Sequence, residues 1–288
     1  MHYVNLASLL LAMPLVWSAI PPASPPPDAV EELARQAAAL HELGRFAEAE
    51  RAYRAALDAA LAGGGSHSAL PLILNNLASV VQDLGRPVQA STLYARALAL
   101  YEQRSGKNHP VLRKPLANLA SLALEDGQAR KAERLYRRAL ALPAPEPGDP
   151  DGAALIWHGL GLSLQAQGRL EDAERCFLQA IALRSALSGA GESLAHSLSS
   201  LALVRLSRGQ FAEALADQRR ALELLEAALP PSHPALARPL SNLAAIHAAL
   251  GRPAEAEPSL RRALGIAASA FGEDHEVYGG ILSNYAEV

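Results

Sequence analysis

Cysteine is almost absent from this sequence, because Cys176 is the only one among 288 residues. A single thiol cannot form an internal disulfide framework, and it supplies neither a zinc finger nor a redox cysteine pair. The phosphate-binding loop, the G-x-S-x-G nucleophile motif and the H-E-x-x-H metal motif are missing as well. We therefore expect no catalytic residues, no metal site and no cofactor, and we predict that the protein is not an enzyme.

The sequence also lacks an excess of either charge and has few aromatic residues. Its 26 basic and 29 acidic residues give a net charge of −3, with both signs interspersed. This balance gives no electrostatic reason to expect a nucleic-acid partner. Aromatic residues make up only 5% of the chain although 50% of it is hydrophobic, and Ala and Leu are abundant. Because Ala and Leu are strong helix formers that fill helix–helix interfaces, the composition favours helices.

One uncharged apolar stretch, LASLLLAMPLVWSAI at Leu6–Ile20, stands near the N-terminus. It is shorter than the ~20 residues of a membrane-spanning helix but has the length of a signal-peptide core. The proline-rich Pro21–Asp28 follows and is typical of an extended spacer. We interpret residues 1–28 as a signal-like leader and spacer of a protein exported to the periplasm or secreted. The alternatives are an uncleaved membrane anchor and a segment that is not translated, which would leave the protein cytoplasmic.

A glycine recurs at intervals of 41 or 42 residues, in contexts such as LGRFAEAE and LGRPAEAE. The six members are Gly44, Gly85, Gly127, Gly168, Gly209 and Gly251. Five and twelve residues after each glycine the residue is always Ala, and nine residues after it an aromatic residue stands in the first four repeats. Before each glycine, large apolar residues and a small residue recur at helical spacing. Each repeat therefore predicts a helix, a turn in which glycine adopts the left-handed conformation, and a second helix.

This pattern resembles the tetratricopeptide repeat, and most closely the longer repeats of kinesin light chains and their bacterial relatives. The resemblance covers residues 29–288, as six repeats plus a partial seventh. It implies an all-α fold, a right-handed superhelical solenoid of stacked helix-turn-helix repeats. Three positions depart from the pattern: Gln36 replaces a Leu, Gln218 replaces an aromatic residue, and Pro258 stands inside a second helix.

Four histidines share one repeat position, 18 residues before the glycine or its expected place: His67, His109, His233 and His275. A zinc ion needs ligand nitrogens within ~2.1 Å, whereas equivalent positions on stacked helices lie roughly 8–10 Å apart. Pro110 and Pro234 follow two of these histidines, at a position typical of the first turn of a helix. We therefore favour packing at the corners between repeats over metal binding or catalysis.

In stacked helical hairpins the first helices line the concave face, where a partner binds. The candidate residues for binding a peptide or partner protein are polar side chains at the inward repeat positions: Asn75, Asn76, Ser79, Gln82, Lys114, Asn118, Ser121, His158, Arg238 and Asn242. Asparagine is a poor residue inside helices, so its recurrence needs a reason. Two remain open, namely that these amides contact a ligand and that they cap or bridge neighbouring helices.

The resemblance also bears on the groove itself. In tetratricopeptide co-chaperones some of these positions form a clamp for a C-terminal carboxylate, and Asn76, Lys114 and Asn118 match part of it. Ala34 and Ala38 stand where other clamp residues are expected, so the clamp is incomplete. Repeats four and five place leucines at inward positions instead of polar residues. Pro143–Gly152, between repeats three and four, predicts a flexible corner.

We thus expect a non-enzymatic protein–protein interaction scaffold in a bacterium-like host, which binds a peptide or partner protein in its concave groove. The alternative is a sensor or regulatory arm of a longer enzyme or signalling protein whose effector domain lies beyond this chain. Self-association through an uncapped C-terminal end is a third expectation, because Leu282 and Tyr285 place an apolar stripe there.

The leader generates the first prediction. Residues 1–28, fused to a reporter that is active only after export, should carry that reporter to the periplasm or medium, because the apolar run has the length of a signal core. The matched control replaces Leu10 and Leu11 with Arg and should retain the reporter in the cytoplasm. Equal cytoplasmic retention of both fusions would contradict the export interpretation.

Overall fold

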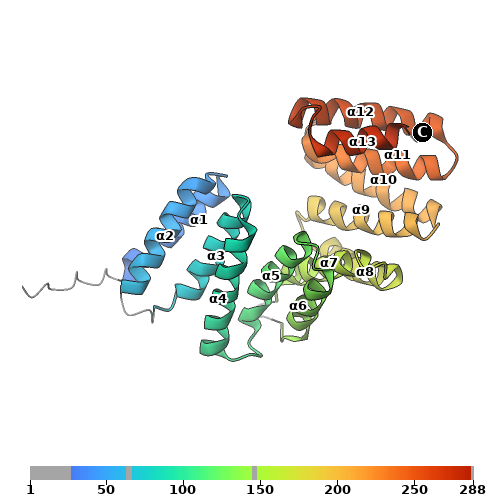
Figure 1. Ribbon diagram of the computed structural model, residues 1–288. Helices are drawn as coiled ribbons and strands as arrows, with labels where there is room; N and C mark the ends of the chain where they lie inside the picture. The colour runs from blue at the N-terminus through green and yellow to red at the C-terminus, as the bar shows by residue number, and fades with distance from the viewer. Residues whose placement is uncertain (1–26, 63–66, 145–147, 287–288) are drawn as a thin grey trace, which may run out of the picture. The chain divides into compact units, whose positions relative to one another are not determined.

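The computed structural model describes residues 27–62, 67–144 and 148–286. Within these ranges the chain forms α-helices and two short 3₁₀-helices (η1 and η2) and no strand, which confirms the all-α prediction (Figure 1). The apolar leader lies outside the described residues. The first helix begins at Pro27, two residues earlier than expected, because proline is well suited to the first helical position.

The helices follow one another without interruption by other elements. In chain order they are α1 (Pro27–Glu42), α2 (Phe46–Ala62), α3 (Leu70–Asp83), α4 (Pro87–Ser105), η1 (Pro110–Leu112), α5 (Arg113–Glu125), α6 (Ala129–Ala141), α7 (Pro150–Gln165), α8 (Leu170–Ser185), α9 (Gly191–Ser207), α10 (Phe211–Ala228), η2 (Pro234–Leu236), α11 (Ala237–Ala249), α12 (Pro253–Phe271) and α13 (Glu276–Ala286). Odd-numbered helices are the first helices of the repeats, and even-numbered helices are the second.

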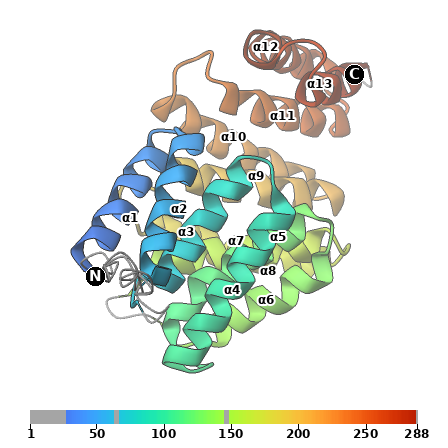
Figure 2. The ribbon, with the colours of Figure 1, turned by 60° about the vertical axis from the view of Figure 1, so that its left-hand side comes forward.

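The chain divides into two compact parts, Met1–Ile73 and Leu74–Val288. The expected corner at Pro143–Gly152 lies inside the second part, and its residues 145–147 are outside the described residues. Helices α6 and α7 on either side of this stretch pack against each other. In the second part each hairpin packs on the next, and both views show α9, α10 and α11 stacked in chain order (Figures 1 and 2).

The glycine turns have the predicted conformation. All six repeat glycines have φ between +70° and +75°, a region that side chains with a Cβ rarely adopt. At the first turn the Gly44 amide donates to the His41 carbonyl and the Arg45 amide donates to the Leu40 carbonyl, both at 2.9 Å. The same two bonds recur at the other five glycines. This is the Schellman motif, which satisfies carbonyls at the end of the first helix and directs the chain into the second.

Small and aromatic residues alternate in the core as the pattern predicts. The alanines five and twelve residues after each glycine have no exposed surface, so the two helices of a hairpin approach closely there. The aromatic residues of the first four repeats, Tyr53, Tyr94, Tyr136 and Phe177, are buried beside them. Burial raises the pKa of Tyr94 and of Tyr136 to about 12, so both phenols stay protonated.

The three departures from the repeat pattern leave the helices intact, and two of them form hydrogen bonds. Gln218 is fully buried where an aromatic residue is expected, and its side-chain amide donates to the Pro239 carbonyl at 2.9 Å. Gln36 is exposed and donates to the Glu32 carboxylate. Helix α12 continues through Pro258. At the C-terminal end Leu282 is exposed as the sequence indicates, whereas Tyr285 is partly buried.

The four recurrent histidines cap the first helices of their repeats. Nδ1 of His67, His109, His233 and His275 accepts a hydrogen bond from the backbone amide two residues ahead, at 3.2–3.3 Å. At His109 and His233 the capped element is a 3₁₀ turn that precedes α5 or α11, so these helices begin late. The histidines therefore recur because each satisfies an amide that has no partner within the helix. Across the described ranges, no three His, Cys, Asp or Glu side chains are placed to hold a metal ion.

Glycine replaces a larger residue at one helix–helix contact in the fourth repeat. Gly159 on α7 lies against Tyr136 on α6, and a Cβ at this position would lie 2.2 Å from the Tyr136 Cζ. The other repeats carry Asn, Ser or Arg at the equivalent position. The ring of Tyr136 therefore occupies the space that a side chain takes elsewhere.

Gly159→Ala should lower the free energy of unfolding by about 1–3 kcal/mol, because the buried ring of Tyr136 must move to admit the methyl group. Urea denaturation measures the change. The matched control is Gly265→Ala, an exposed position in α12 with no atom within 4 Å of an added Cβ. There Ala should raise stability by roughly 0.5–1 kcal/mol. Two variants of equal stability would show that the α6–α7 contact tolerates the methyl group.

Candidate partner-binding groove

The ten predicted site residues lie on the first helices of repeats two, three, four and six, all within Leu74–Val288. Helix α3 carries Asn75, Asn76, Ser79 and Gln82; α5 carries Lys114, Asn118 and Ser121; α7 carries His158; and α11 carries Arg238 and Asn242. Asn75 is buried, Lys114 and Arg238 are exposed, and the other seven are partly exposed. The register therefore places most of these side chains where a ligand can reach them.

The asparagines of repeats two and three bridge neighbouring first helices. The Asn118 amide donates to Asn75 Oδ1 at 3.1 Å, and the Asn75 amide donates to Asn76 Oδ1 at 3.2 Å. The same bridge recurs between Asn284 on α13 and Ser241 on α11, at 2.8 Å. Bridging is one of the two roles that the sequence left open. Asn76 and Asn118 keep partly exposed surface, so contact between these two amides and a ligand stays a prediction.

Gln82 and Ser121 belong to a second polar cluster between α3 and α5. The Gln82 side-chain amide donates to Glu125 Oε1 at 2.8 Å, and the Tyr94 hydroxyl donates to Gln82 Oε1 at 3.3 Å. The Ser121 hydroxyl donates weakly to the same Glu125 carboxylate, at 3.4 Å. The repeat spacing did not identify Glu125 as a member of this cluster. Its contact with Gln82 exists only because α3 and α5 lie side by side. Most polar groups in this half of the groove already have partners.

A cavity of about 450 Å³ lies further along the groove. Its walls come from the first helices α7, α9 and α11, the 3₁₀ turn η2, and the corner where α12 leads into α13. Apolar side chains form much of the lining, and they include Leu162, Leu203, Phe271 and Val277. The cavity contains three of the ten predicted residues, His158, Arg238 and Asn242.

Two polar side chains in this cavity, Ser199 and Asn242, have no partner among the described residues. The Ser199 hydroxyl oxygen is buried and forms no hydrogen bond, and the neighbouring Asn242 side chain forms none within the described part of the chain. Arg238 lies 3.5 Å from the Glu276 carboxylate, and both side chains are mostly exposed. Since a buried polar atom without a partner costs free energy, a ligand that bonds to Ser199 would recover that cost.

His158 forms the neutral polar wall of the cavity. Its Nδ1 lies 3.2 Å from the Ser197 hydroxyl, which also accepts a hydrogen bond from the buried Arg184 at 2.6 Å. Burial, followed by repulsion from Arg184 and His196, lowers the pKa of His158 to about 4. The imidazole is therefore uncharged near neutral pH and contributes shape and hydrogen bonding rather than charge.

Sequence reasoning missed some of the lining for two reasons. Ser199 and Ser200 occupy inward repeat positions, and the repeat spacing was the signal that could have selected them. Phe271 and Val277 belong to the end of a second helix and the start of α13, so their position depends on how the corner folds. Leu162 and Leu203, two of the inward leucines of repeats four and five, line the cavity.

This geometry defines a class, a helical-repeat protein built from stacked two-helix hairpins. The chain matches the family model of the tetratricopeptide repeat over residues 30–103, 69–143, 152–227 and 235–288. These segments include most of the chain, which therefore belongs to the tetratricopeptide repeat family. A search of curated proteins gives no significant match. Within the described residues, no helix is long and apolar enough to span a bilayer.

Solved structures support the same fold. BtubC from P. vanneervenii is 26% identical with a TM-score of 0.60, over 85% of this chain and 93% of that chain. A kinesin light chain-like protein of Podosopora anserina with nearly identical repeats is 22% identical with a TM-score of 0.58, over 72% and 99%. PilW, a type IV pilus biogenesis factor, is 17% identical with a TM-score of 0.64, over 88% and 98%. The expected resemblance to kinesin light chains and bacterial relatives is confirmed, and the fold is that of a protein–protein interaction scaffold.

The neutral state of His158 generates a prediction on pH. An unfolded histidine has a pKa near 6.5, whereas burial lowers the folded value to about 4. Between these values the unfolded state binds more protons, so the free energy of unfolding should fall as pH falls from about 6.5 to about 4, by up to ~3 kcal/mol. His158→Gln removes the titrating group and should flatten the pH dependence of urea denaturation in this window. Parallel curves for the two proteins would show that His158 is not held neutral.

Proposed function

We propose that this protein is a non-catalytic scaffold that holds an extended segment of a partner protein in the groove of its first helices. The observation that carries the proposal is the cavity of about 450 Å³ on α7, α9 and α11. It combines an apolar lining with polar groups that lack partners, and ligand sites of proteins typically combine the same two features.

The lining indicates what the segment looks like. Leu162 and Leu203 offer an apolar surface for one large apolar side chain, and the unpartnered Ser199 and Asn242 stand beside them. A side-chain amide donates and accepts at once, as an extended peptide backbone requires. A partner segment can therefore place one apolar side chain in the cavity while the backbone amide of the same residue hydrogen-bonds to the Asn242 side chain.

In this proposal a carboxylate of the partner segment does not contribute most of the binding free energy. The polar groups nearest the apolar lining are neutral, since His158 has a pKa of about 4. The cation of Arg238 is exposed and already lies beside Glu276. Attraction between exposed charges contributes little, ~0–1 kcal/mol, so apolar burial and hydrogen bonds are expected to dominate.

The test starts from a partner captured by the full chain from an extract of its native organism and identified by mass spectrometry. The binding segment is then mapped with overlapping peptides and titrated by calorimetry. Leu203→Asp should weaken binding by at least ~tenfold, because burial of a large apolar side chain is worth roughly 1.5–3 kcal/mol. Asn242→Ala should weaken it by several-fold, because one hydrogen bond is worth about 0.5–1.5 kcal/mol.

The matched control is Val88→Asp on α4, which adds the same charge at a side chain that is 80% exposed and lies outside the cavity lining. It should bind like the wild type, and thermal melts should show all three variants folded. Wild-type affinity in Leu203→Asp and Asn242→Ala would place the partner elsewhere and end the proposal.

A further inference from the structure

The outer surface of the third and fourth repeats differs in charge from the rest of the chain. Helix α6, with the sequence ARKAERLYRRALA, contains five cations and one acidic residue, whereas the whole chain has a net charge of −3. Arg130, Arg134 and Arg137 follow one another at intervals of four and three residues, so they share one face of the helix. This face is exposed at all three positions.

The acidic residues of this surface are already engaged. Glu133 accepts from Arg137 and from Arg169, each at 2.9 Å. Asp172 on α8 pairs with Arg169 at 2.5 Å and also pairs with Arg175. The hydrogen bond from Arg169 holds the pKa of Asp172 below its usual range, so this carboxylate stays ionised.

Three cations of the same surface have no acidic partner. Arg130, Lys131 and Arg134 are exposed and form no ion pair or side-chain hydrogen bond within the part of the chain that the structure describes. Six cations, including Arg137, Arg169 and Arg175, thus share the α6–α8 surface with Glu133 and Asp172, while Glu171 and Glu174 of α8 pair with Arg208 at the end of α9. The surface carries a local positive surplus that the overall composition conceals.

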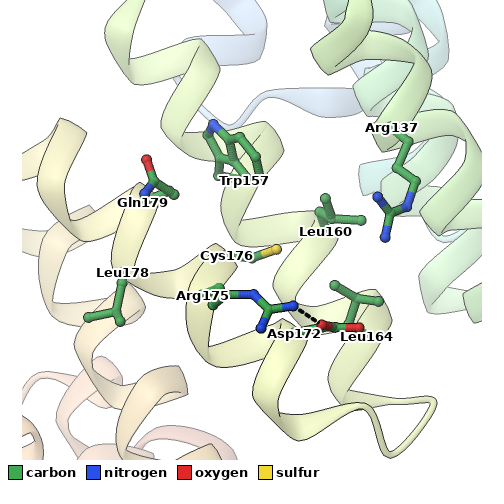
Figure 3. Close-up of a pocket in the computed structure, with 9 residues that line it drawn as sticks. All are labelled: Arg137, Trp157, Leu160, Leu164, Asp172, Arg175, Cys176, Leu178 and Gln179. Atoms are coloured by element: carbon green, nitrogen blue, oxygen red, sulfur yellow. Dashed lines mark hydrogen bonds and ion pairs between the residues drawn. The ribbon is translucent and has the colours of Figure 1, made fainter.

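An apolar cavity of about 410 Å³ opens on the same surface; its lining cations are Arg137 and Arg175, which pair with Glu133 and Asp172. Trp157, Leu160 and Leu164 from α7 and Cys176 from α8 line it, while Arg137 and Arg175 approach it from α6 and α8 (Figure 3). Cys176 stands eight residues after the glycine, where repeats two and three carry the larger Leu93 and Leu135, and repeats one and six carry the small Ala52 and Ser259.

The cysteine contributes an apolar wall rather than chemistry. Burial raises the pKa of the Cys176 thiol to about 11, so it stays protonated near neutral pH. A protonated, buried thiol behaves as a small apolar group. The neighbouring Leu178 is 41% exposed, which extends the apolar area onto the surface.

We propose that the surface formed by α6 and α8 is a second docking site, which takes an acidic segment of a partner protein and inserts one of its apolar side chains into the cavity at Cys176. The surplus of cations matches an acidic segment, and the apolar cavity on the same surface requires an apolar anchor. A nucleic acid would neutralise the cations but would place no apolar side chain in the cavity, so a protein segment fits better. The site shares no lining residue with the groove cavity and does not depend on the groove proposal.

The test uses the full chain with Trp17→Phe, which leaves Trp157 as the only indole because the sequence has two tryptophans. The probe is a synthetic peptide of glutamates with one central leucine, and the matched probe carries serine in its place. The leucine peptide should change the Trp157 emission saturably, and its affinity should fall with added salt. It should bind about tenfold tighter than the serine peptide, because only leucine is buried in the cavity.

Two further variants separate charge from shape. Arg134→Glu should weaken binding of the leucine peptide several-fold, because it replaces attraction of the acidic probe by repulsion. Cys176→Leu restores the residue of repeats two and three and should remove the preference for leucine over serine by filling the cavity. Arg220→Glu on α10 reverses an exposed arginine outside this surface and should leave binding unchanged. Thermal melts confirm that each variant is folded, and the comparison of the two peptides on the Trp17→Phe chain does not depend on these three substitutions.

The outcomes distinguish this site from others. Equal affinity of the two peptides, or no binding of either, would overturn the proposal. So would a single-stranded thymidine oligonucleotide that binds as tightly as the leucine peptide and is unaffected by Cys176→Leu. Peptide binding that is lost in Leu203→Asp but retained in Arg134→Glu would assign the probe to the groove and would also overturn it.

Discussion

The close approach of two helices over an alanine is the constraint on which the rest of this structure depends. Both alanines that follow each repeat glycine are completely buried, so the second helix lies where a larger side chain would separate it from the first. The left-handed glycine turn brings the chain into that position, and its two hydrogen bonds satisfy carbonyls at the helix end. Because contact and turn recur at the same spacing, each hairpin of the second compact part packs on the next in the same way.

This constraint assigns the two helices of a repeat to different surfaces, which can then vary independently. First helices provide the groove, where the lining changes from bridged amides in repeats two and three to an apolar cavity in repeats four to six. Second helices provide the outer surface, where α6 concentrates cations and α8 leaves a cavity at Cys176. Neither change disturbs the buried alanines, so a scaffold of this kind acquires a new surface without altering its core.

The sequence predicted what depends on spacing within one repeat. The glycine turns, the buried alanines and the aromatic positions all follow from a period of 41 or 42 residues. It did not predict what depends on contacts between repeats. The bridge from Asn118 to Asn75, the space that Tyr136 takes from Gly159 and the wall that Phe271 adds to the groove cavity all require helices from different repeats to be placed side by side. The histidines were predicted in part. The sequence showed that they share one repeat position, but it did not show that their side chains accept a hydrogen bond from a backbone amide.

If a partner segment binds in the groove cavity as proposed, part of its binding energy comes from a cost already present in the free protein. The buried Ser199 hydroxyl has no partner, and Asn242 beside it forms no side-chain hydrogen bond among the described residues. The folded chain therefore bears a desolvation cost at this point that the buried alanines and leucines of the repeats offset. A segment that supplies a donor or acceptor to Ser199 removes this cost in addition to burying apolar surface. A segment that fits the cavity but lacks such a group leaves the cost in place, so the unpartnered hydroxyl favours partners by their hydrogen bonds where the leucines alone would select only for size.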